Sequence, residues 1–103
     1  MPLYVSLGKA TMQGVQKIRE VGQRYEANRK MYEAMGVKLV ALYALMGEYD
    51  YLSIVEAPDN ETALKAAVAV SSRGNSTWVT VPAVPIEEFS QLVGDVGEAG
   101  QGG

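Results

Sequence analysis

The feature that most constrains the fold of this chain is the spacing of its apolar residues. Along the sequence this spacing switches between the two-residue repeat of a strand and the three-to-four-residue repeat of a helix. From Leu3 to Lys9, bulky apolar residues alternate with smaller or polar ones, as in a strand. From Val15 to Met35, apolar residues recur at steps of three, four and seven between charged ones, which predicts a long amphipathic helix. Gly36 follows where a left-handed helix cap is expected. The chain therefore begins with a strand and a helix.

The middle of the chain predicts two strands followed by a second helix. Residues 37–45 and 49–57 are rich in strand formers and flank a short turn that contains glycine, which predicts a hairpin. Asp59 or Asn60 can then cap an alanine-rich helix that runs to about residue 72.

The C-terminal part predicts one more strand and a short helix. Residues 77–81 are good strand material that ends before Pro82. Residues 85–93 begin with proline and two glutamates, which suit the first turn of a helix. Five of the ten residues 94–103 are glycine, so we expect a flexible tail there.

These elements follow one another as strand, helix, strand, strand, helix and strand. Two right-handed crossovers then give an α+β fold, the ferredoxin-like βαββαβ sandwich. We expect a four-stranded antiparallel sheet in the order 4-1-3-2, with two helices on one face and a short C-terminal helix. A chain of 103 residues has room for one domain, which we place at residues 1–93.

Composition excludes several kinds of chemistry. The chain has no Cys and no His, which removes disulfides, thiolate nucleophiles and imidazole bases, and we predict no metal site and no cofactor. The net charge of −3 argues against a nucleic-acid partner. Basic residues among the first 38 are interleaved with glutamates, as on a solvated helix. With neither a signal peptide nor a membrane span recognised, we expect a cytoplasmic protein without a membrane partner.

The hairpin segment carries a recognisable motif. Its sequence from Gly47 to Asp59, GEYDYLSIVEAPD, resembles the signature of the GYD domain family. The resemblance extends from about Leu3 to Phe89, although a Ser-Pro-x-Arg segment that is frequent in the family is reduced here to Arg24. It implies the ferredoxin-like fold but no generally established activity.

Two further resemblances bear on function. The segment from Gly47 to Leu52 is similar to the effector-binding domains of feast/famine regulators, although the chain lacks their helix-turn-helix module. The architecture also resembles that of dimeric α/β-barrel enzymes, which is a likeness of fold and does not fix function.

The alternation of the strands predicts which side of the sheet the helices cover. We place Leu3, Val5, Leu7, Leu52 and Ile54 beneath the helices. The open side would then be aromatic and hydroxyl-bearing, and we expect a second copy of the chain to cover it in a homodimer or larger homo-oligomer. A cavity between the subunits could bind a small molecule. Its candidate ligand-binding residues are Tyr4, Ser6, Tyr51, Ser53, Trp78 and Thr80.

These observations lead to two functional hypotheses. The preferred one is a non-catalytic small-molecule-binding or assembly module with an intersubunit cavity. The alternative is a cofactor-independent enzyme of the dimeric α/β-barrel type, acting on a small aromatic or quinone-like substrate. We assign no catalytic residue.

Lys9, Gly47, Tyr49 and Asp50 are interpreted as motif or structural residues. Antiparallel pairing would bring Asp50 close to Lys9, with both side chains on the helix-covered side. The Asp50 carboxylate could also accept hydrogen bonds from backbone amides of residues 10–15. We therefore expect Asp50 to anchor the start of the first helix.

Overall fold

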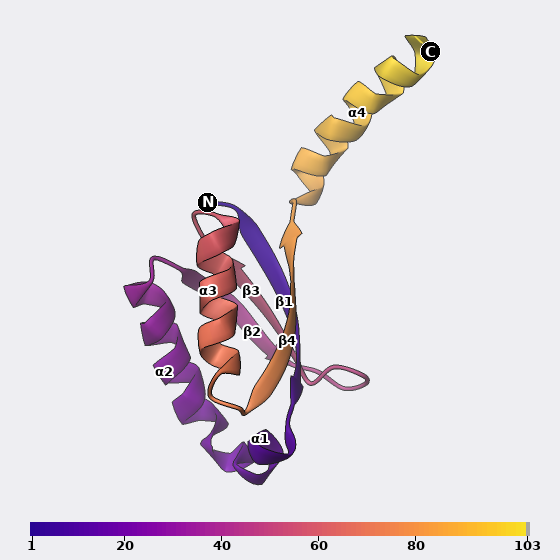
Figure 1. Cartoon of the computed structure of the whole chain (residues 1–103). Helices are drawn as coiled ribbons and strands as arrows, with labels where there is room; N and C mark the ends of the chain where they lie inside the picture. The colour runs from indigo at the N-terminus through magenta and orange to yellow at the C-terminus, as the bar shows by residue number, and fades with distance from the viewer. Residues whose placement is uncertain (103) are drawn as a thin grey trace.

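The computed structural model describes residues 1–102, with side chains described through Val96 (Figure 1). Four strands and two main helices form the body, and a third long helix extends away from it. The elements in chain order are β1 (Leu3–Ala10), α1 (Met12–Gln16), the 3-10 helix η1 (Ile18–Glu20), α2 (Val21–Ala34), β2 (Lys38–Ala44), β3 (Tyr51–Glu56), α3 (Asn60–Ser71), β4 (Ser76–Ala83) and α4 (Ile86–Gly102).

The four strands form one antiparallel sheet in the order β2-β3-β1-β4. This is the predicted order viewed from the opposite edge, so the α+β fold with a four-stranded antiparallel sheet is confirmed. The arrangement is compatible with the ferredoxin-like sandwich. Pro82 lies in β4, which is an edge strand, so its missing amide hydrogen does not interrupt the sheet.

The single long helix predicted for residues 15–35 is wrong, because the chain bends after α1. Lys17 leaves helical geometry, and the Arg24 side chain donates a 2.8 Å hydrogen bond to its carbonyl. Close packing also fixes this corner, since a Cβ at Gly14 would lie 2.0 Å from the Asn75 carbonyl oxygen. The predicted end of the helix is confirmed, with Gly36 at φ +78°.

The core lies between the sheet and the helices α2 and α3, which cover the same side of it (Figure 1). Tyr4 and Val55 are cross-strand neighbours, and they pack with Ala63 and Ala66 of α3. The predicted assignment of faces is therefore wrong, and the side with Tyr4 and Val55 lies beneath the helices. The alanines bring α3 close to the sheet, so only small side chains fit on the part of the sheet beneath it.

The C-terminal helix α4 is longer than predicted. It continues past Val93 to Gly102, and Val96 extends the apolar spacing of Leu92 and Val93. In Figure 1, α4 points away from the sheet and the other helices, and the longest dimension of the molecule is 58 Å. The flexibility predicted for residues 94–102 stays a prediction, and Gly103 lies outside the described residues.

Candidate functional site

The family-like motif forms the turn between β2 and β3. Gly47 has φ +117°, a value that side chains strongly disfavour, and the Leu45 amide donates to the Asp50 carbonyl at 2.8 Å. Asp50 then connects this turn to β1. Its amide donates to the Gly8 carbonyl at 2.9 Å, and its carboxylate accepts a 2.8 Å hydrogen bond from the Ala10 amide. The hydrogen bond expected from residues 10–15 is therefore present.

Lys9 does not form the predicted pair with Asp50. Its ammonium group lies 3.8 Å from a carboxylate oxygen of Glu48 and 5.2 Å from the centre of the Tyr49 ring. By strand alternation, Lys9 lies on the open side of the sheet with Leu7, so its predicted place beneath the helices is also wrong. Lys9 and Asp50 thus hold the turn through different contacts.

The six candidate ligand-binding residues lie beneath the helices and not on the open side. Several of their polar groups already have partners within the chain. Ser6 and Thr80 share a 2.7 Å hydrogen bond, the Tyr4 hydroxyl donates to Asn60 at 2.6 Å, and the Trp78 indole donates to Ser76 at 2.8 Å. The Tyr51 ring stacks on the Trp78 ring with centroids 6.1 Å apart. This set therefore does not line the side of the sheet on which the intersubunit cavity was expected.

Two small hollows adjoin these residues. One of about 20 Å³ is lined by Ser6, Ser53, Thr80 and Trp78 together with residues of α2 and α3. The second, of about 50 Å³, is lined by Trp78 and Tyr51 together with residues of α2. Such volumes suit one or a few water molecules. Tyr4 also lines a third, wider and open hollow of about 860 Å³, together with Asn60 and Pro82. Ligand binding by these residues stays a prediction.

Residues of the helices complete these hollows, and they are not among the six predicted ligand-binding residues. Tyr32 lines the first hollow, and burial raises the pKa of its hydroxyl, which keeps it protonated. Arg24 and Asn28 line the second. The helical spacing of Tyr25 and Tyr32 indicates which face of α2 is buried. It does not indicate which part of the sheet that face contacts.

The middle of the open side of the sheet is apolar and mostly aliphatic. Cross-strand pairing aligns its residues in two rows that cross all four strands. Val79 and Val81 are 55% and 48% exposed, and Tyr43 is 56% exposed. The first row comprises Ala41, Ile54, Val5 and Val81, and the second comprises Tyr43, Leu52, Leu7 and Val79. This continuous apolar surface is of the kind that marks an interaction site.

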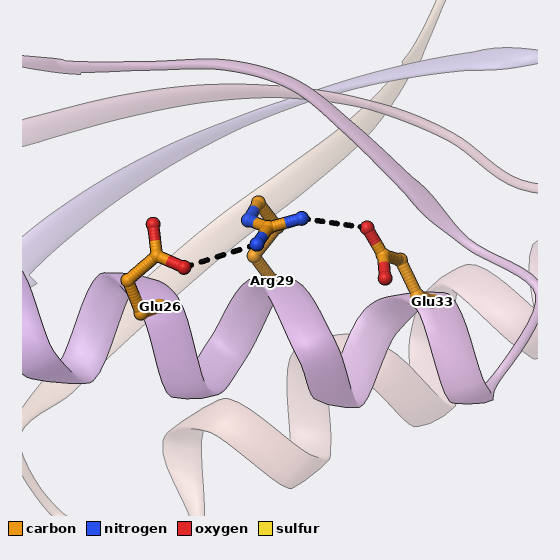
Figure 2. Close-up of polar contacts among 3 residues, drawn as sticks. All are labelled: Glu26, Arg29 and Glu33. Atoms are coloured by element: carbon orange, nitrogen blue, oxygen red, sulfur yellow. Dashed lines mark hydrogen bonds and ion pairs between the residues drawn. The ribbon is translucent and has the colours of Figure 1, made fainter.

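Charged residues on α2 form a local network instead of an open anion site. Figure 2 shows Arg29 between Glu26 and Glu33, at 3.0 and 2.7 Å. The hydrogen bond and charge of Glu26, with the charge of Glu33, raise the pKa of Arg29. All three side chains are exposed or partly exposed, so this network agrees with the predicted solvated helix.

Within the described residues, no three acidic, His or Cys side chains come together as metal ligands would. None of the helices described there combines the length and the apolar character needed to cross a membrane.

Comparison with known proteins identifies the family. The model of the GYD domain matches residues 4–93. The chain is 33% identical over 90 residues to the "Glutamine synthetase and cystathionine beta-lyase binding protein" of Thermus thermophilus, a match that covers 86% of this chain and 95% of that relative. No solved structure matches the chain significantly. With nearly the whole body of the fold matched, this chain belongs to the GYD domain family.

Proposed function

We propose that this chain is a non-catalytic module that associates with itself through the open side of its sheet and binds partner proteins. The observation that carries the proposal is the pair of aliphatic rows, which cross all four strands and are covered by no other element of the described chain. Removing apolar area from water yields about 25 cal/mol per Å², so covering these rows favours association. A homodimer is the simplest arrangement, because a twofold axis lets one face cover its own copy.

The relative supports the second half of the proposal, since its name describes a protein that binds two metabolic enzymes. Protein partners of this chain would be of the same kind. The cytoplasmic location predicted above is compatible with such partners and stays a prediction.

Light scattering tests self-association. The wild-type chain is expected to show about twice its 11.1 kDa mass at high micromolar concentration. Val79→Lys places a charge in the second row and should weaken association by roughly 100-fold. Val68→Lys is the matched control, because Val68 on α3 has a similar exposure of 58% but lies outside the sheet. A monomeric wild-type chain would contradict the sheet interface. Equal weakening of self-association in Val79→Lys and Val68→Lys would contradict it as well.

Calorimetry tests the binding of other proteins. Purified glutamine synthetase and cystathionine beta-lyase from the source organism are titrated separately with the wild-type chain. Binding of at least one enzyme is expected. Failure of both to bind at about 100 µM would contradict partners of this kind, without affecting the light-scattering result.

A further inference from the structure

We propose that α4 is an arm that packs against a second copy of this chain and completes the sheet-face interface. The inference rests on the self-association proposed above and concerns a segment that the sheet interface does not include. Its apolar stripe consists of Ile86, Phe89, Leu92, Val93 and Val96, each about half or more exposed. Their spacing of three and four residues places them on one side of the helix.

The helix needs a covering surface. Glycines at positions 94, 97, 100 and 102 are among the least helix-favouring residues, and a short helix in water is marginal without packing. Its opposite side carries Glu87, Gln91 and Asp95, so only the stripe is suited to burial.

The geometry of the connection favours a surface on another molecule. Val84 and Pro85 alone separate β4 from α4, and the Phe89 amide already donates to the Pro85 carbonyl. The link is therefore short, and α4 continues outward instead of returning to its own sheet (Figure 1).

The area of the sheet indicates that the occupant is the second copy. Strands of this length with usual spacings give the open side a projected area of about 450 Å². A stable interface usually buries about 800 Å² of accessible surface on each partner, so further apolar surface beside the sheet strengthens a dimer. The α4 helix, about 25 Å long, begins two residues after the end of β4, the strand that carries Val79 and Val81, so its stripe lies near the edge of the apolar rows. An exchanged arm thus adds buried apolar area to that of the sheet.

Photo-crosslinking between isotopically distinct chains tests this arm. Because the chain has no cysteine, Val93→Cys provides a single attachment point for a benzophenone maleimide. The chain that carries the crosslinker is mixed with wild-type chain enriched in ¹⁵N, allowed to exchange subunits, irradiated and digested. Peptides that join light α4 to a heavy chain are expected. Gln91→Cys on the polar side is the control and should give a several-fold lower yield.

The outcomes separate this inference from the function on which it rests. A dimer by light scattering whose α4 cross-links only within its own chain, or not at all, overturns the arm and leaves the sheet interface intact. Cross-links that appear only to added glutamine synthetase also overturn it, because α4 would then bind the enzyme. A monomer by light scattering contradicts the proposed self-association itself. Leu92→Glu should weaken the dimer at least tenfold, whereas Gln91→Glu should not.

Discussion

The two sides of the sheet contrast in chemistry and in what covers them. The side beneath α2 and α3 carries Ser6, Ser53 and Thr80 between Tyr4 at one end and Tyr51 and Trp78 at the other. The open side carries the apolar rows. An alanine-rich helix lies close to its sheet, so small hydroxyl side chains with satisfied hydrogen bonds fit there. The side of a sheet that carries the longest aliphatic rows is thus not always the side that its own chain covers.

The largest expected effect comes from adding volume beneath the helices. A Cβ at Gly8 would lie 2.7 Å from the Trp78 ring, so Gly8→Val should lower the free energy of unfolding by about 3 kcal/mol. Urea unfolding measures this. Val79→Ile, which adds a methylene on the open side, should change it by less than about 0.5 kcal/mol. If both substitutions changed the free energy of unfolding equally, the two sides of the sheet would not differ in how tightly they are packed.

Removing volume should give the next largest difference. Val55 is buried and Val79 is exposed, so the same substitution can be compared on the two sides. Val55→Ala should cost about 2 kcal/mol and Val79→Ala less than about 0.5 kcal/mol. Both are measured by urea unfolding at dilutions where the chain is monomeric. Similar losses at the two positions would mean that the open side is also packed within one chain.

A smaller effect is expected at Asp50, which joins the turn to β1 at the end of the sheet. Its side chain is exposed, so Asp50→Ala should cost about 1 kcal/mol, near the lower limit for a charged hydrogen bond. Asp50→Asn keeps an oxygen acceptor and should recover part of the loss. The denaturant midpoints of the three proteins measure it, and an unchanged midpoint in Asp50→Ala would exclude the anchor.

The smallest effect concerns the start of α3, the helix that lies on the small side chains. Hydrogen bonds from Thr62 hold the pKa of the Asp59 carboxyl below its ordinary value of 3.8. The ionised Asp59 carboxylate therefore stabilises the folded state when the pH is above the ordinary pKa. This contribution is lost as the pH falls through the lower pKa of the folded state. The urea midpoint of the wild type should therefore decrease when the pH is lowered beneath about 4. Asp59→Asn still caps the helix, and its midpoint should decrease less over the same pH range. Identical slopes would exclude this contribution.

Much of the fold and part of the site were predictable from local signals. Period, turn glycines and helix caps act over a few residues, which is why Gly36 and Gly47 were placed correctly and Asp59 was one of the two predicted caps of α3. A hydrogen bond from the amides of residues 10–15 to Asp50 was also expected, because antiparallel pairing of β1 with β3 determines which strand ends meet. The partner of Lys9 was not, since a long flexible side chain can reach either Glu48 or Asp50 from the same backbone position.

The sequence by itself determined the order of the elements, the antiparallel sheet and the family, because these depend on periodicity and on a contiguous motif. Only the tertiary structure decided which side of the sheet the helices cover. Alternation separates Val5 from Ser6 but is symmetric between the two sides, and the choice depends on how closely the alanines of α3 approach. The break at Lys17 was decided in the same way, because it depends on Gly14 meeting Asn75, a residue distant in the chain.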